Sequence, residues 1–140
     1  MNGPVQFVYE VDGDNFTSAG EASIAIKKNL RLLGFDPTVI RRVAIAMYEG
    51  EINMVIHAGG GTATVSVYPD KVVMELKDRG PGIADIDLAM SEGFSTAPEN
   101  IRNLGFGAGM GLPNMKKNTD EMKIESTLGV GTTITMTVNI

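Results

Sequence analysis

The sequence contains no cysteine, and its only histidine is His57. Without cysteine the chain has neither a disulfide nor a thiolate metal site. No apolar run approaches the roughly 20 residues that cross a bilayer, and residues 1–7 lack the basic and apolar segments of a signal peptide. These absences lead us to expect a soluble, cytoplasmic protein.

Positive charge is also scarce, since 12 basic residues face 17 acidic ones and the formal net charge is −5. An acidic chain gives no support to a nucleic-acid or anionic-membrane partner. A hydrophobic content of 43% with 21% charged residues is typical of a folded globular protein. A chain of 140 residues can bury a sizeable core, and no repeat or linker divides it, so we expect one domain over residues 1–140.

Alternating and helical periodicities predict the secondary structure. Gly34 predicts the end of a first helix, and Asp36 followed by Pro37 predicts the start of a second, apolar and central one. The predicted order is strand 5–11, helix 17–33, helix 37–58, strands 62–68 and 72–77, a helical turn at 85–90, a helix opening at 112, and strands 122–127 and 132–140. This order predicts an α+β fold, a two-layer α/β sandwich with a mostly antiparallel sheet and helices on one face.

Glu49, Asn53 and His57 are spaced four residues apart in the second predicted helix, so they share one stripe of its surface. Polar residues on a helix surface are common, but a solvated face would not be bordered by Ile45, Ile52 and Ile56. An amide oxygen such as that of Asn53 suits Mg²⁺, and a carboxylate one turn earlier can act as a general base. His57 is undecided, because a histidine near a helix end is often structural.

Asp78, Gly80 and Gly82 form a D-x-G-x-G pattern at the end of a predicted strand. A tight turn would explain this pattern. Alternatively, Asp78 accepts a hydrogen bond from an exocyclic amine such as that of adenine, while the glycines let the backbone pass close to a flat base.

Glycines alternate with other residues from Gly105 to Gly111 and lead into a predicted helix. Backbone amides in such a segment can cradle phosphates. The segment is neither a P-loop nor a dinucleotide fingerprint, and residues 91–110 as a whole predict a long functional loop. A last glycine pair, Gly129 and Gly131, precedes Thr132 and Thr133 and by itself predicts a hairpin turn.

Together and in this order, the four motifs resemble the Bergerat ATP-binding fold of the GHKL superfamily, which includes histidine kinases, type II topoisomerase subunits and heat-shock chaperones. Residues 48–57 resemble the N box of the small anti-sigma serine/threonine kinases. Residues 105–116 are most similar to the switch kinase of the bacterial stressosome.

The resemblance implies a role for each matching position. Asn53 would bind magnesium, Glu49 would be the catalytic general base, and Asp78 would accept the adenine amine. Thr133, or alternatively Thr132, would lie near the adenine. The remaining nucleotide-binding positions are those beside the base and in the phosphate lid: Gly80, Gly82, Ile83, Gly105, Gly107, Gly109, Met110, Gly111 and Leu112.

The implied activity is Mg²⁺- and ATP-dependent phosphorylation of serine or threonine on a regulatory partner of the STAS type, in a sigma-factor or stress-signalling switch. The alternative is an anti-sigma factor that acts mainly by nucleotide-dependent binding of a sigma factor. The chain has no dimerisation helix with a phosphoacceptor histidine and no long C-terminal domain, so we do not expect a complete histidine kinase, topoisomerase subunit or chaperone. A homodimer remains open.

Overall fold

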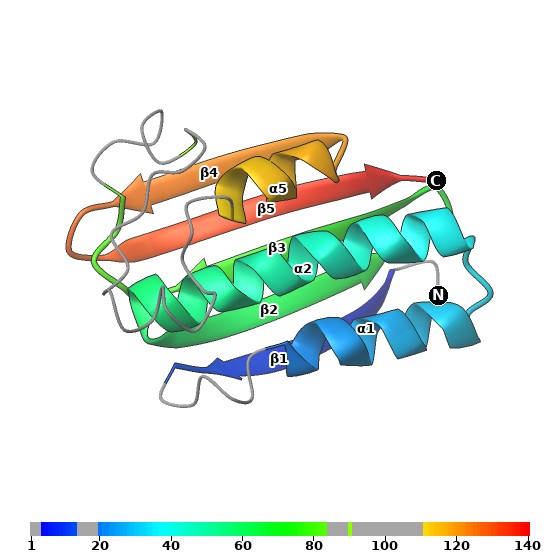
Figure 1. Cartoon of the computed structure of the whole chain (residues 1–140), viewed down its shortest axis with the longest axis horizontal. Helices are drawn as coiled ribbons and strands as arrows, with labels where there is room; N and C mark the ends of the chain where they lie inside the picture. The colour runs from blue at the N-terminus through cyan, green and yellow to red at the C-terminus, as the bar shows by residue number, and fades with distance from the viewer. Residues whose placement is uncertain (1–3, 14–19, 84–89, 91–110) are drawn as a thin grey trace.

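A computed structural model describes residues 4–13, 20–83, 90 and 111–140 (Figure 1). The described elements follow the order β1 (Val5–Asp12), α1 (Glu21–Leu32), α2 (Pro37–Ala58), β2 (Gly60–Val67), β3 (Lys71–Asp78), α5 (Gly111–Lys117), β4 (Glu121–Thr127) and β5 (Gly131–Asn139). Within these residues, no helix has the length and apolar character needed to span a membrane. The predicted helical turn at 85–90 and the loop at 91–110 lie outside the described residues, apart from Met90.

The five strands form one sheet in the order β1-β2-β3-β5-β4, and every neighbouring pair is antiparallel. The three helices of the described residues, α1, α2 and α5, cover the same face of this sheet, with α2 over its centre (Figure 1). This arrangement confirms the predicted α+β sandwich with helices on one side.

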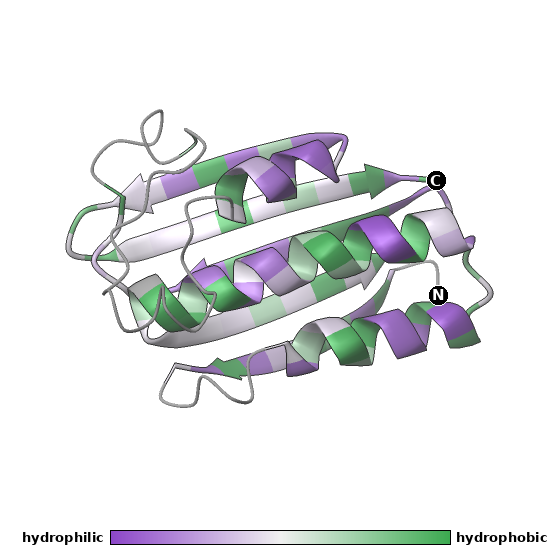
Figure 2. Ribbon diagram, in the orientation of Figure 1, coloured by the Kyte–Doolittle hydropathy of each residue, from purple (hydrophilic) through white to green (hydrophobic). Residues whose placement is uncertain are grey.

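Alternation along the strands gives the sheet two different faces. The helix-covered face is apolar, and on it Val65, Met74 and Met136 are fully buried. On the open face the strand register aligns Thr64 with Glu75 and Glu75 with Thr135. Polar and apolar residues likewise alternate along α1 (Figure 2), because one side of this helix packs into the core.

The helix ends carry the predicted signals. Asp36 caps α2 by accepting a hydrogen bond from the Thr38 N–H at 2.8 Å, with Pro37 as the first helical residue. At the end of α1, Gly34 has a φ of 82° and donates to the Arg31 carbonyl. This left-handed residue ends the helix as predicted.

Two element starts differ from the predictions. Helix α1 begins at Glu21 rather than near residue 17, because Gly20 is in the left-handed conformation with a φ of 102°. Strand β2 begins at Gly60 rather than Thr62, because Gly59 alone ends α2 and the next two glycines pair with the end of β1. A Cβ on Gly60 would lie 2.3 Å from the Val11 carbonyl oxygen, so only glycine fits this approach.

Glu51 provides the N-terminal cap of α1, although it belongs to α2. Its carboxylate is only 2% exposed. Its Oε2 accepts hydrogen bonds from the backbone N–H groups of Gly20 (2.9 Å) and Ala22 (3.1 Å), and its Oε1 accepts one from Ser23 (2.8 Å). A negative charge at a helix N-terminus is also favoured by the helix dipole. The side chain of Glu51 therefore joins the two long helices.

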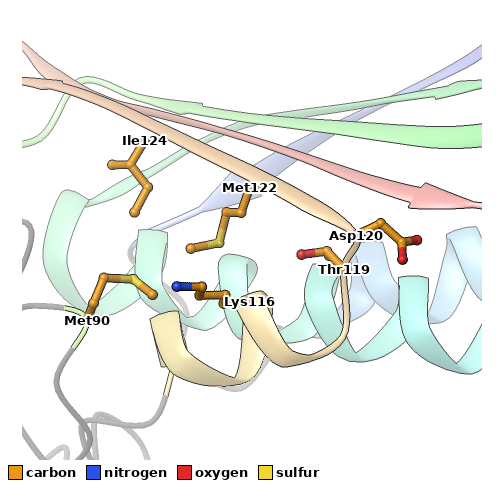
Figure 3. Close-up of a pocket in the computed structure, with 6 residues that line it drawn as sticks. All are labelled: Met90, Lys116, Thr119, Asp120, Met122 and Ile124. Carbon is orange, nitrogen blue, oxygen red and sulfur yellow. The ribbon is translucent and has the colours of Figure 1, made fainter.

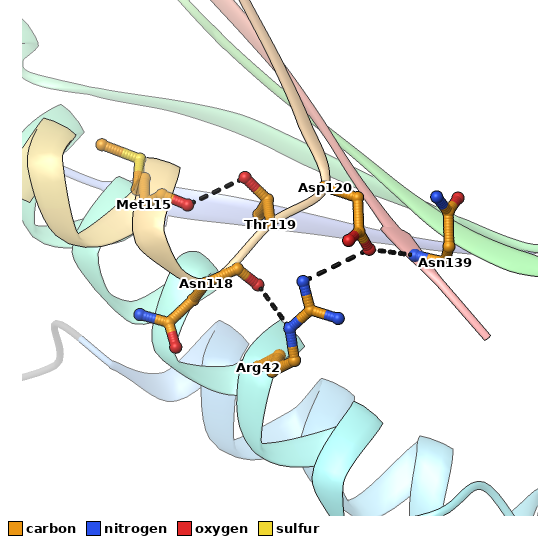
Figure 4. Close-up of polar contacts among 6 residues, drawn as sticks. All are labelled: Arg42, Met115, Asn118, Thr119, Asp120 and Asn139. Carbon is orange, nitrogen blue, oxygen red and sulfur yellow. Dashed lines mark hydrogen bonds and ion pairs between the residues drawn. The ribbon is translucent and has the colours of Figure 1, made fainter.

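A polar cluster holds the turn between α5 and β4 against α2 (Figure 4). Arg42 of α2 donates from Nε to the Asn118 carbonyl at 3.1 Å and pairs with Asp120 at 3.2 Å. The backbone N–H of Asn139 donates to the same carboxylate oxygen at 2.7 Å. This N–H and then Arg42 hold the pKa of the Asp120 carboxyl below its usual value. The C-terminal end of α5 is thus fixed to α2.

We expect Glu51→Ala to lower the free energy of unfolding by about 3 kcal/mol, because buried backbone N–H groups lose a charged acceptor. Chemical denaturation followed by circular dichroism measures this change. Glu125→Ala is the matched control, since the Glu125 side chain is 65% exposed and should cost little. Equal stabilities for the two variants would contradict the capping role of Glu51.

Candidate functional site

Helix α2 lies unusually close to the sheet where Gly50 faces it. A Cβ at this position would be 2.2 Å from Cδ2 of Leu76 and 3.6 Å from the sulfur of Met115. Glycine costs stability inside a helix, so this close contact explains its presence there. The neighbouring stripe of Glu49 and Asn53 is partly exposed. The predicted stripe therefore lies on the helix side that borders α5.

The carboxylate of Glu49 faces the start of α5. A Cβ on Gly111 would lie 3.6 Å from Oε2 of Glu49. Burial raises the pKa of the Glu49 carboxyl above its usual value, and a side-chain hydrogen bond with Asn114 acts in the opposite direction. A half-buried carboxylate with a raised pKa is a stronger base than an exposed one, which suits it to accept a proton from a hydroxyl.

Asp78 ends β3 with its carboxylate almost buried, at 8% exposure. Its Oδ1 accepts hydrogen bonds from the Gly80 N–H at 2.9 Å and the Thr132 N–H at 3.1 Å. Within the described residues, Oδ2 has no hydrogen-bond donor. The carboxylate is therefore held in place through one oxygen, and the other is available to accept from an amine.

The loop after Asp78 rests on the β4–β5 hairpin. The Ile83 N–H donates to the Ser126 hydroxyl at 2.7 Å, and this hydroxyl lies 2.9 Å from that of Thr132. The Gly129 N–H donates to the Pro81 carbonyl at 2.9 Å. Sequence reasoning did not find Ser126, because a serine inside a short polar strand carries no distinguishing pattern.

The two glycines of the D-x-G-x-G pattern are explained by contacts with protein. A Cβ on Gly80 would lie 2.6 Å from the Cβ of Ala58 at the end of α2. Gly82 has a φ of 82°, and its Cβ would lie 2.6 Å from the Thr127 carbonyl oxygen. The loop is therefore fitted between α2 and β4, which places Asp78 near the end of the helix that carries Glu49 and Asn53.

The structure separates the two threonines that the sequence left open. Thr132 is 5% exposed and lies beside Asp78. Thr133 is aligned with Lys77, on the open face of the sheet. Because side chains alternate along a strand, only Thr132 can face a ligand at Asp78. The geometry therefore favours Thr132, and a nucleotide contact by either threonine stays a prediction.

The predicted phosphate lid is described only at its end. Gly111 opens α5, and the side chain of Leu112 is buried in the core at 6% exposure. Any contact of Leu112 with a phosphate would therefore involve its backbone. Gly105, Gly107, Gly109 and Met110 lie outside the described residues. His57 lies in the last turn of α2, and its role stays undecided.

The residues around Asn53 fit a magnesium ion that is carried by a nucleotide. The described part of the chain has no group of three or more histidine, aspartate or glutamate side chains that could hold a metal by itself. Mg²⁺ commonly takes one or two protein oxygens and completes its shell with phosphates and waters. The amide oxygen of Asn53, partly exposed beside Glu49, provides one such ligand.

A cavity of about 340 Å³ lies on the other side of α5, between this helix and β4. None of the predicted site residues lines this cavity. The residues that line it are Met90, Lys116, Thr119, Asp120, Met122 and Ile124 (Figure 3). Helix α5 therefore separates this cavity from Glu49.

Two characterised proteins are similar to this chain in sequence. The anti-sigma F factor of Caldanaerobacter subterraneus is 37% identical over 109 residues, covering 73% of each chain. The serine/threonine-protein kinase RsbT of Bacillus subtilis is 36% identical over 106 residues, covering 73% of this chain and 74% of its own.

Two solved structures share the fold at low sequence identity. The RsbU and RsbW domains of Rv1364c from Mycobacterium tuberculosis give a TM-score of 0.66 at 18% identity over 96% of this chain. The match spans only 32% of that longer chain. The mycobacterial sensor histidine kinase MprB gives a TM-score of 0.55 at 17% identity, covering 96% of this chain and 97% of its own.

A family model described as histidine kinase-, DNA gyrase B- and HSP90-like ATPase matches residues 38–140. The match includes the Glu49–Asn53 stripe and all three glycine motifs, and it confirms the resemblance drawn from them. The chain belongs to this family of ATPases, for which ATP is the nucleotide.

Proposed function

We propose that this chain is an Mg²⁺-ATP-dependent serine/threonine protein kinase whose substrate is a regulatory partner of the STAS type. The observation that carries the proposal is a half-buried Glu49 carboxylate with a raised pKa one helical turn from Asn53. The 36% identity to a serine/threonine-protein kinase supports it. Such a switch would operate in the cytoplasm.

At the adenine end of the proposed site, Oδ2 of Asp78 accepts a hydrogen bond from the exocyclic amine of adenine. Thr132 lies beside the Asp78 carboxylate. The two backbone N–H groups on Oδ1 keep the carboxylate oriented for this contact. Gly80, Gly82 and Ile83 shape the loop beneath the base.

We expect Thr132→Val to weaken ATP binding by about two- to tenfold, the value of one hydrogen bond. Thr133→Val should leave the affinity unchanged, because its side chain is on the opposite face of the sheet. Isothermal titration calorimetry of both variants with ATP makes the comparison. Equal losses, or a loss only in Thr133→Val, would reverse the assignment.

At the phosphate end, the Asn53 amide oxygen and Glu49 act on the transferring group. Asn53 would hold Mg²⁺ through its amide oxygen, and the ion would supply positive charge to offset that of the phosphates. Backbone N–H groups of the glycine segment would complete the phosphate contacts. The residues concerned are Gly105, Gly107, Gly109, Met110, Gly111 and Leu112. Glu49 takes the proton of the partner's hydroxyl while that oxygen bonds to the γ-phosphorus and the bond to ADP breaks.

Asn53→Ala should abolish phosphotransfer from ATP to the partner, because it removes the only proposed protein ligand of Mg²⁺. Asn53→Asp keeps an oxygen at this position and should retain Mg²⁺-dependent ATP binding. Asn29→Ala is the control, because Asn29 lies on α1, away from the proposed site. Its amide donates a hydrogen bond to the Tyr9 hydroxyl at 3.0 Å. Transfer is followed with γ-labelled ATP, and full activity in Asn53→Ala would remove Asn53 from the site.

The raised pKa of Glu49 predicts how activity depends on pH. A general base works only when ionised, so activity falls as pH drops through its pKa. Because burial raises this pKa, the acid limb should be centred above about 4.3, the value for an exposed glutamate. A profile of transfer rate against pH measures the midpoint. In Glu49→Gln we expect a loss of at least a hundredfold and no such limb in the residual rate.

A second candidate is an anti-sigma factor that binds a sigma factor and uses ATP to set its affinity. The 37% identity to an anti-sigma F factor favours this alternative. Pull-downs with a sigma factor and with a STAS-domain partner, each with ATP or ADP, separate the two functions. A second copy of the chain as a partner can be tested in the same samples by light scattering.

A further inference from the structure

Helix α5 presents one face to the carboxylate of Glu49. Gly111 and Asn114 are three residues apart, so they lie on the same side of this helix. The position of a Cβ on Gly111 is 3.6 Å from Oε2 of Glu49, and the Asn114 side chain lies close enough to the same carboxylate to lower its pKa by hydrogen bonding. One side of the Glu49 carboxylate thus faces the first turn of α5.

The chemistry of this contact has one sense. An ionised carboxylate only accepts, so the Asn114 amide must be the donor. Such a bond favours the ionised form of Glu49. It also restricts a long side chain that could otherwise adopt many rotamers. Among the described residues, Asn114 is the one side chain that donates to Glu49.

The turn that follows α5 is also joined to α2, at a residue two turns earlier in α2 than Glu49. There Arg42 binds the Asn118 carbonyl and the Asp120 carboxylate (Figure 4). Arg42 contacts Asn118, whereas Glu49, later in α2, contacts Asn114, which is earlier in the chain than Asn118. The two helices therefore run antiparallel. With one end fixed at Arg42, the first turn of α5 is held over Glu49.

We propose that Asn114 is the positioning residue for Glu49: its amide orients the carboxylate for proton transfer, so that the base is in place only when the first turn of α5 lies against α2. This inference rests on the proposed kinase function. It links the base to the glycine segment, because α5 begins at Gly111, the last glycine of that segment. A displacement of Gly111 would carry Asn114 away from Glu49.

The test compares Asn114→Ala and Asn114→Asp with Asn118→Ala, which removes an amide four residues further along the chain, just after the end of α5. The Asn118 amide bonds to the Asn114 carbonyl at 2.9 Å and is not recorded as a partner of Glu49. For both Asn114 variants we expect kcat of phosphotransfer to fall at least about tenfold, with the KM for ATP within twofold of the original. The loss should be larger in Asn114→Asp, because a second carboxylate repels the first. Asn118→Ala should keep its kcat.

A double-mutant cycle separates positioning from general damage. In Glu49→Gln the carboxylate is already gone, so adding Asn114→Ala should cost no further activity. Additive losses, an unchanged kcat in Asn114→Ala, or a rise in KM alone would overturn the proposal.

The same cycle applied to thermal unfolding without nucleotide distinguishes this proposal from the kinase function. Unfolding midpoints of the single and double variants should show coupling between Glu49 and Asn114, and none between Glu49 and Asn118. Absence of coupling at Asn114 overturns the contact, whatever the activity. Coupling in a protein that binds ATP but transfers phosphate to no partner would instead refute the kinase function, and with it a catalytic meaning for the contact.

Discussion

The close approach of α2 to the sheet at Gly50 is the constraint on which the site depends. Without a Cβ at this position, the helix axis can lie nearer to β3 and α5 than side chains normally allow. Leu76 and Met115 fill the space, and both are almost fully buried. The polar stripe beside Gly50 is therefore held at a fixed height above the sheet. A bulkier residue would lift the helix and displace the stripe from Asp78 and from α5 together.

The two ends of the proposed site are fixed by different means. Asp78 is held by backbone donors of its own loop and of β5, so its position depends on strand pairing. Glu49 depends on how α5 packs along α2, through Asn114 at one end and Arg42 at the other. The end of the site proposed to bind adenine is thus part of the sheet, whereas the end proposed to bind the phosphates is assembled between two helices. A short helix of seven residues is the easier of the two to shift.

Local signals in the sequence were enough to predict most of the fold. Gly34, Asp36 and Pro37 act through bonds within a few residues of themselves, so the helix ends they mark could be found. Alternation along the strands likewise gave the sheet and its apolar face. The early start of β2 was missed because a glycine run looks like a loop until its partner strand is known.

The parts of the site that depend on distant partners were harder to predict. Choosing between Thr132 and Thr133 required the register of β5 on β3, since one residue changes the face of the sheet. Glu51 stands two residues from Glu49 and has the same side chain, yet it bonds to backbone N–H groups about 30 residues earlier in the chain. Asn114 belongs to the segment 105–116 that resembles the stressosome switch kinase, but nothing in the sequence indicated that it lies beside Glu49. In none of these cases does the spacing in the sequence indicate which residues come into contact.

The cap that Glu51 provides also bears on the order in which the chain folds. During synthesis, α1 is made before Glu51, the residue whose side chain caps its first turn. A helix of 12 residues is marginal alone in water, and this one has a glycine rather than a side-chain cap at its start. Helix α1 therefore gains its stable first turn only after α2 has formed beside it. The stability of the N-terminal helix therefore depends on the same helix that carries the proposed catalytic residues.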